Sequence, residues 1–323
     1  MSEPILTVSH LCKQYRIPGT RRYLNAVNDV SFSIMPGETF GLVGESGCGK
    51  STIAKLILCL EPPTKGQILF MGTDLNALSE RERRPLRPKL QMVFQDSGSS
   101  LNPRKRIRDI LSEPMLHHRI CPPSEMEKRI DDLLSQVGLS PQAKSRYPHE
   151  FSGGQRQRIC IARALSLDPQ LIVLDEPVSA LDVSVQAQIL NLLRDLQKER
   201  NLTYLFIGHG LGAVHYLSTR MAVMYRGELV ETGQSDALFD APVHPYTRSL
   251  FDAAPIADYD LRDRKRSLLV GEVGDPVPEG ACPLYPRCPL RETETCQHYH
   301  GRLTPVAGDD THLSCCHRAG GVL

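Results

Sequence analysis

Residues 44–51 read Gly44-Glu45-Ser46-Gly47-Cys48-Gly49-Lys50-Ser51, and this stretch decides the fold. An apolar run at 40–43 precedes it and favours a short buried strand, whereas 51–58 follows it and favours a helix. Glycines without side chains let successive backbone N–H groups point at phosphate oxygens, and the start of the helix adds positive charge. Strand, glycine loop and helix together predict a P-loop that binds a nucleoside triphosphate.

Two side chains of this loop carry the phosphate chemistry. Lys50 can bridge the β- and γ-phosphates of a triphosphate, and the Ser51 hydroxyl can bind Mg²⁺. The thiol of Cys48 could be reactive, but a small residue tolerated at a variable loop position is the simpler interpretation. The predicted nucleotide-contacting set also includes the neighbouring Glu45, Ser46 and Thr52.

An acidic pair ends a second apolar strand. Residues 171–174 are all apolar, and Asp175 and Glu176 follow them directly. A carboxylate at the end of a buried strand is costly unless it serves a cation, so Asp175 is expected to hold Mg²⁺ through water. Glu176 is then placed to orient or deprotonate the attacking water. The alternative is that the pair caps a helix.

The rest of the chain predicts an α/β protein. Residues 1–40 alternate apolar and polar positions, as antiparallel strands do, and 203–207 is another buried strand. An amphipathic helix is expected at 183–200, and 100–165 should be mainly helical. Strands that alternate with helices imply a largely parallel sheet. From about residue 250 the composition changes to Pro, Gly and Cys, which indicates an appended small domain.

The bulk composition excludes some classes of function. Lys plus Arg is 38 and Asp plus Glu is 37, so no overall attraction to nucleic acid exists and no nucleic-acid partner is expected. No apolar run approaches the roughly 20 residues that span a bilayer. The N-terminus lacks the charged and then apolar pattern of a signal peptide, so we expect a cytosolic chain that reaches membranes through a partner.

Cysteines are concentrated near the C-terminus. Half of the ten cysteines lie from residue 282 onward: Cys282, Cys288, Cys296, Cys315 and Cys316. In a reducing cytosol, such clustering favours metal or iron–sulfur ligation over disulfides.

A second glycine-rich segment narrows the class of nucleotide-binding protein to which the chain can belong. Phe151-Ser152-Gly153-Gly154-Gln155 stands between the P-loop and the acidic pair, and a basic helix follows it. In this combination the chain resembles the ATPase subunit of an ABC transporter over about residues 5–250. The resemblance implies an ABC ATPase core at 1–250, with a parallel RecA-like sheet, an antiparallel β subdomain and a helical signature subdomain at about 96–165. It also implies ATP and Mg²⁺ as ligands and transport-coupled ATP hydrolysis.

The resemblance assigns roles to individual residues. Tyr15 matches the aromatic residue that stacks on adenine, although Tyr23 competes for that role and either tyrosine could instead pack in the core. Gln95 matches the glutamine that touches Mg²⁺, together with Ser51 and Asp175, and that links the site to the membrane part. The resemblance also makes Lys50, Gln95 and Glu176 catalytic residues, with a switch histidine near the γ-phosphate at His209.

Other matched residues point to a dimer. Ser152, Gly153, Gly154 and Gln155 match the signature that faces the γ-phosphate held by a second ATPase subunit. Asp182 ends the loop that crosses between subunits. The family usually has Asp after the switch histidine, but this chain has Gly210. This departure leaves open a catalytically weak subunit that supports a more active partner.

Further regions resemble the oligopeptide/dipeptide importer subfamily: residues 176–186, residues 99–104 and, above all, the motif His244-Pro245-Tyr246-Thr247-Arg248-Ser249-Leu250. That resemblance implies two transmembrane permease subunits, a second ATPase subunit that is not identical, and an extracytoplasmic solute-binding protein. It places the chain at the cytoplasmic face of the inner membrane, and the solutes would be peptides or related compounds such as nickel chelates. A soluble ABC ATPase that acts on ribosomes or DNA is the alternative, but the chain has one P-loop and no heptad arm.

The same subfamily carries a cysteine pattern in its C-terminal extension, here at 251–323. The resemblance favours a [4Fe–4S] cluster held by Cys282, Cys288, Cys296 and Cys316, because four thiolates are what such a cluster needs. Structural zinc requires the same ligands and is the main alternative, followed by a buried cluster of thiols without metal. Cys315 competes with Cys316 as the fourth ligand.

Overall fold

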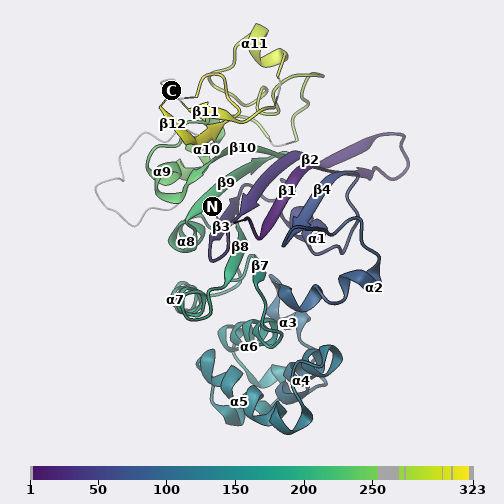
Figure 1. Ribbon diagram of the computed structural model, residues 1–323. Helices are drawn as coiled ribbons and strands as arrows, with labels where there is room; N and C mark the ends of the chain where they lie inside the picture. The colour runs from purple at the N-terminus through teal and green to yellow at the C-terminus, as the bar shows by residue number, and fades with distance from the viewer. Residues whose placement is uncertain (1–2, 254–268, 273, 300, 307, 320–323) are drawn as a thin grey trace.

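The described part of the chain folds into two sheets and a separate group of helices (Figure 1). The computed structural model describes residues 3–253, 269–272, 274–299, 301–306 and 308–319. Helix α1 (Lys50–Ile57) packs between the two sheets, and its buried Ile53 and Leu56 share one apolar cluster with strands of both. The helix that follows the glycine loop is thereby fixed on two sides.

The smaller sheet comes from the N-terminal part of the chain. In the described residues it has four antiparallel strands in the order β2 (Tyr23–Ile34), β1 (Leu6–Arg16), β4 (Lys65–Phe70) and β5 (Thr73–Asp74). Leu6 and Val8 of β1 are buried while Thr7 between them is partly exposed, as expected for a sheet with one buried face. The antiparallel strands predicted for this region are confirmed.

The larger sheet is mixed. Among the described residues it has eight strands, in the order β11 (Thr304–Val306), β12 (Asp309–Ser314), β10 (Glu228–Gln234), β9 (Arg220–Tyr225), β3 (Thr39–Val43), β8 (Thr203–Gly208), β7 (Leu171–Asp175) and β6 (Leu90–Val93). The five strands from β9 to β6 run parallel, and β10, β12 and β11 are antiparallel. Every residue of β3, β7 and β8 is buried, as their apolar runs predict.

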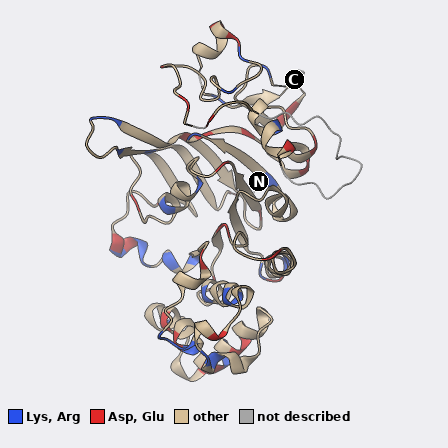
Figure 2. Cartoon of the chain, turned by 180° about the vertical axis from the view of Figure 1, so that it is seen from behind, with Lys and Arg blue, Asp and Glu red and all other residues tan. Residues whose placement is uncertain are grey.

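The predicted helical region is confirmed and forms the lower part of Figure 1. Its helices are α3 (Ser97–Ser100), α4 (Ile107–His118), α5 (Met126–Gln136) and α6 (Gly153–Leu165), with 3-10 turns at Pro123–Glu125, Pro141–Ser145 and Pro148–Glu150; another 3-10 turn, Arg87–Lys89, precedes β6. Figure 2 shows both signs of charge on these helices, and ion pairs join them to each other and to adjoining turns. Examples are Lys105 with Glu113 at 2.8 Å and Lys144 with Asp131 at 2.7 Å.

The remaining helices are α2 (Glu80–Arg83), α7 (Val183–Arg200), α8 (Leu211–Leu217), α9 (Ser235–Asp240), α10 (Pro245–Asp252) and α11 (Thr293–Gln297). The amphipathic helix predicted at 183–200 is therefore confirmed as α7. In the parts of the chain that the structure describes, no helix has both the length and the apolar character needed to cross a membrane.

The C-terminal segment is attached to the main sheet. Strand β12 pairs with β10, and β11 pairs with β12, so these two strands extend the larger sheet. Glu231 of β10 is fully buried, and its carboxylate accepts hydrogen bonds from the backbone N–H groups of Val243 and His244 at 2.8 and 2.9 Å. The same carboxylate lies 2.6 Å from His312 of β12. One buried acid therefore connects β10, the start of α10 and the C-terminal hairpin.

We predict a pH-dependent loss of stability from His244, which begins α10 and accepts the N–H of Tyr246 at 3.1 Å. Burial lowers the pKa of His244 to about 4, although the Glu231 carboxylate opposes the shift. Between an unfolded-chain pKa of about 6.5 and this value, only the unfolded chain binds the proton. Stability should therefore fall as the pH drops through this window, by about 2 kcal/mol between about pH 7.5 and pH 5.

Urea unfolding at the two pH values measures this loss. Asn at position 244 keeps an acceptor for the Tyr246 N–H but does not titrate, so the His244→Asn variant should lose correspondingly less stability on acidification. An equal loss in the two proteins would show that His244 does not contribute.

Candidate nucleotide site

The glycine loop is crowded on its inner side. Gly44 has φ 152° and Gly49 has φ 113°, conformations that residues with side chains rarely adopt. A Cβ at Gly44 would lie 2.2 Å from the carbonyl oxygen of Met224, and one at Gly49 would lie 2.2 Å from that of Ala26. Only glycine fits at these two positions, because both loop ends press against neighbouring backbone.

Lys50 is held inside this loop. Its side chain is nearly buried, and Nζ donates to the carbonyl oxygens of Gly44 and Glu45 at 2.7 and 2.9 Å. Nζ also lies 3.6 Å from the Sγ atom of Cys48. Burial raises the pKa of the Cys48 thiol, which favours a small packing residue over a reactive one. The loop thus holds the Lys50 ammonium group against two of its own backbone carbonyl oxygens.

Asp175 closes the loop from the side of β7. The Ser51 hydroxyl donates to Oδ1 of Asp175 at 3.2 Å. Burial raises the pKa of Asp175, while the hydrogen bond from Ser51 opposes the shift. A largely buried carboxylate beside a hydroxyl is a donor set of hard oxygens, which suits Mg²⁺.

Two polar side chains meet at one carboxylate oxygen of Glu176. Gln95 Nε2 donates to Oε2 of Glu176 at 2.9 Å, and Nδ1 of His209 lies 3.1 Å from the same oxygen. The Glu176 backbone is left-handed, with φ 48°, and its N–H donates to the carbonyl oxygen of Ile207 at 2.8 Å. Such a backbone is costly for a residue with a side chain and is found where a particular direction is needed. The predicted residues Gln95, Glu176 and His209 are therefore brought together.

The signature residues lie elsewhere. Ser152 begins α6, its Oγ accepts the N–H of Gln155 at 3.3 Å, and Oε1 of Gln155 accepts the N–H of Ser152 at 3.0 Å. A Cβ at Gly154 would lie 2.4 Å from Val185 at the start of α7, where Asp182 is the N-cap. In Figure 1 this helix start belongs to the lower, helical part, while α1 lies beneath the antiparallel sheet. The fold thus separates the signature from the P-loop of the same chain.

The two tyrosine candidates differ in their surroundings. The Tyr15 hydroxyl donates to Glu61 at 2.5 Å, and Lys13 lies 5.1 Å from the ring centre. Burial and Glu61 raise the pKa of Tyr15, and a hydrogen bond with Thr52, near the start of α1, opposes them. Tyr23 is 60% exposed on β2. Tyr15 is thus the candidate that lies beside the P-loop helix, and its partner Glu61 was not predicted from the sequence.

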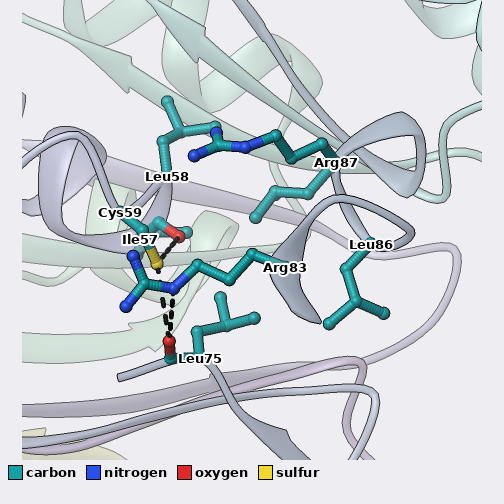
Figure 3. Close-up of a pocket in the computed structure, with 8 residues that line it drawn as sticks. Ile57, Leu58, Cys59, Leu75, Arg83, Leu86 and Arg87 are labelled. Atoms are coloured by element: carbon teal, nitrogen blue, oxygen red, sulfur yellow. Dashed lines mark hydrogen bonds between the residues drawn. The ribbon is translucent and has the colours of Figure 1, made fainter. Parts of the chain in front are cut away.

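A small cavity of about 30 Å³ lies at the other end of α1 (Figure 3). Arg83 Nε donates to the carbonyl oxygen of Leu75 at 2.9 Å, and the Cys59 thiol lies 4.0 Å from the same oxygen. These contacts fasten α2 to the chain that follows α1, which is a structural role.

The cysteine-rich segment surrounds another cavity of about 30 Å³, lined by Cys282, Cys288, Cys296, Cys315 and Cys316. Burial raises the pKa of Cys282 to about 12 and also raises that of Cys288 and Cys316. Backbone N–H groups two residues further along the chain oppose this effect at all three positions. Within the described ranges, no three His, Cys, Asp or Glu side chains are arranged to hold a metal ion.

Comparison with known proteins identifies the family and the fold. The family model described as "ABC transporter" matches residues 27–179, and the model described as "Oligopeptide/dipeptide transporter, C-terminal region" matches residues 230–296. A dimeric ATP-binding cassette, MJ0796, in a post-hydrolysis state bound to ADP and Pi has TM-score 0.65 and 28% identity, covering 71% of this chain and 98% of that one.

Curated relatives extend over most of the chain. The oligopeptide transport ATP-binding protein AppF of Bacillus subtilis is 48% identical over 91% of this chain and 89% of its own length. The oligopeptide transport ATP-binding protein OppF of Salmonella typhimurium is 48% identical over 85% of this chain and 83% of its own length. The chain therefore belongs to the ABC transporter family, in the group of oligopeptide transport ATP-binding proteins.

Proposed function

We propose that this ABC ATPase hydrolyses ATP where the P-loop, Asp175 and the Gln95–Glu176–His209 group meet. The observation that carries the proposal is the convergence of Gln95 and His209 on one oxygen of Glu176. A carboxylate fixed in this way has a defined direction, as a residue that orients or deprotonates water requires. The Glu176 side chain is 16% exposed, so a water molecule from the solvent can reach its carboxylate.

Each residue of the site has its own proposed role in ATP hydrolysis. Backbone N–H groups of the loop and of α1 bind phosphate oxygens, and Lys50 exchanges the carbonyls of Gly44 and Glu45 for the β- and γ-phosphates. Ser51, Asp175 and Gln95 hold Mg²⁺, which when bound neutralises phosphate charge. Glu176 accepts the proton of the attacking water, and His209 keeps that carboxylate aligned. Tyr15 supports the adenine.

The signature requires a second subunit. Ser152 and the N–H groups of Gly153 and Gly154 form an anion site at the start of the 13-residue helix α6. Because the fold separates them from their own P-loop, they serve the γ-phosphate of a partner, and Asp182 lies at the same interface. We infer that the partner is a related, non-identical ATPase subunit.

The transported solutes are proposed to be oligopeptides or related compounds, because relatives at 48% identity bear that name. The chain would lie at the cytoplasmic face of the inner membrane, bound to two permease subunits that receive solute from an extracytoplasmic binding protein. We place the permease in a groove of about 890 Å³ between β6 and the helical part. Phe94, which is 42% exposed, lines the groove beside Gln95, so a docked segment would sit next to the catalytic group.

The cysteine cavity is proposed to hold a [4Fe–4S] cluster through Cys282, Cys288, Cys296 and Cys316, with zinc as the alternative. Five thiols in one buried cavity repel one another once ionised, and a bound cation removes that repulsion. Cys296 Sγ accepts the N–H of Glu292 at 3.4 Å, and backbone donors also face Cys282, Cys288 and Cys316. At Cys315, in contrast, burial raises the pKa of the thiol and Tyr299, rather than a backbone N–H group, opposes that shift. This difference supports Cys316 as the fourth ligand.

We predict that Glu176→Gln lowers kcat for ATP by about 100-fold or more while ATP affinity stays the same, because only the proton acceptor is lost. Lys50→Ala should instead abolish measurable ATP binding. Equilibrium binding and phosphate release, measured with permease subunits present, separate the two effects. Glu199→Gln on the exposed side of α7 is the control. A Glu176→Gln variant that turns over like wild type would refute the assignment.

The same assay tests the catalytically weak alternative, which Gly210 motivates. A Cβ at Gly210 or at Gly212 meets no atom within 4 Å, so an aspartate fits at either position. A slow wild-type enzyme that gains activity from Gly210→Asp, but not from Gly212→Asp, would favour that alternative.

We predict that Phe94→Asp weakens binding to the permease subunits and lowers oligopeptide uptake, while ATP affinity is unchanged. The Asp carboxylate would lie in the groove where an apolar permease segment is proposed to dock, and burying it there would be costly. Co-purification with the permease measures the effect, and Val270→Asp, at a position 83% exposed, is the control. Normal assembly of Phe94→Asp would show that the permease binds elsewhere.

We predict that protein purified without oxygen contains iron and absorbs visible light, and that Cys288→Ser and Cys316→Ser remove both properties. Cys315→Ser should retain them, as should Cys121→Ser outside the cavity. Metal analysis with absorption spectra distinguishes the outcomes. Stoichiometric zinc would replace the cluster assignment, and metal-free wild-type protein would refute both.

A further inference from the structure

The C-terminal part of the chain reaches back to the P-loop at Glu45. The backbone N–H of Glu45 donates to the Tyr246 hydroxyl at 2.9 Å. Tyr246 lies in the first turn of α10, is 1% exposed, and packs against Tyr225 with ring centres 4.5 Å apart. The hydroxyl that meets the loop is therefore held by a rigid, buried ring.

Arg287 binds the side chain of the same residue. Its Nη1 lies 3.3 Å from Oε2 of Glu45, and its Nη2 lies 3.5 Å from Oε1. Nη1 also donates to the Tyr225 hydroxyl at 3.3 Å. The Arg287 side chain is 10% exposed and that of Glu45 is 30% exposed, so water screens this pair less than it screens a surface pair.

The third polar group of Glu45 faces the catalytic lysine. Its carbonyl oxygen accepts from Lys50 Nζ at 2.9 Å, so the position of Glu45 affects that of Lys50. The Glu45 carboxylate is also a negative charge in a loop that must receive a triphosphate. Without a cation beside it, this carboxylate would repel the ligand, and Arg287 supplies that cation.

Tyr246 and Arg287 lie outside residues 27–179, which match the family described as "ABC transporter", and inside residues 230–296, which match the C-terminal region family. We propose that Tyr246 and Arg287 are positioning residues for ATP: they fix the P-loop through Glu45 and neutralise its charge. The C-terminal segment thereby sets the ATP affinity of the core. This inference rests on the proposed role of the P-loop.

A double-mutant cycle on ATP affinity tests whether Arg287 neutralises the charge of Glu45. Arg287→Ala should raise the Kd and KM for MgATP by about three- to tenfold at low salt, with kcat nearly unchanged. Adding Glu45→Gln to that variant should restore affinity, because no carboxylate remains to repel the phosphates. Arg287→Lys should retain most of the affinity. Arg291→Ala, which removes a guanidinium stacked on Tyr285 in the same segment, is the control.

The hydrogen-bond part is tested by Tyr246→Phe. Removal of the hydroxyl leaves the Glu45 N–H without its partner and should weaken MgATP binding by up to about tenfold. Tyr285→Phe is the matched control. Unchanged affinity in both Arg287→Ala and Tyr246→Phe would overturn the inference. So would a loss in Arg287→Ala that Glu45→Gln does not reverse, since Arg287 would then act only through folding of the segment.

MgATP binding by the wild-type protein distinguishes failure of this inference from failure of the proposed function on which it depends. Failure of the wild-type chain to bind MgATP would refute the proposed P-loop role itself. Normal wild-type binding together with unaffected variants would refute only the positioning by Tyr246 and Arg287.

Discussion

The register of three buried parallel strands determines where the chemistry can occur. Val43 of β3 pairs with Gly208 of β8, and Ile207 of β8 pairs with Asp175 of β7. Since parallel strands present their carboxyl ends at one edge, the P-loop, the acidic pair and His209 all emerge side by side. A slip of one residue would turn Asp175 toward the opposite face of the sheet. Burial of the apolar residues in these strands therefore fixes the positions of the charged groups at the strand ends.

Around that edge, separate parts of the fold contribute different surfaces. The core supplies the P-loop and the acidic pair, while the helical part carries the signature on α6 and one side of the large groove. Gln95 follows β6 at the border of these two parts and contacts Glu176. The Gln95–Glu176 contact thus lies at the boundary at which a membrane partner is proposed to dock, and any relative movement there would displace this hydrogen bond.

The C-terminal segment is built into the same framework. It adds β12 to the edge of the main sheet, and its neighbouring residues Arg287 and Cys288 point to different places. Arg287 meets the P-loop residue Glu45, whereas Cys288 lines the cysteine cavity. Two adjacent residues of the chain thus contact the cysteine cavity and the P-loop.

The sequence by itself determined the P-loop, the buried strands, the helix at 183–200 and the family, because these depend on local periodicity and on residues close together in the chain. It also indicated the residues that meet at Glu176, although their roles remain proposals. It did not indicate Glu61 as the partner of Tyr15, the joining of β12 to β10, or the contacts of Glu45. Tyr246 and Arg287 lie 201 and 242 residues from Glu45 in the chain, and no periodic pattern links such positions. Only tertiary packing decided those contacts, because it alone brings distant side chains within reach of a hydrogen bond.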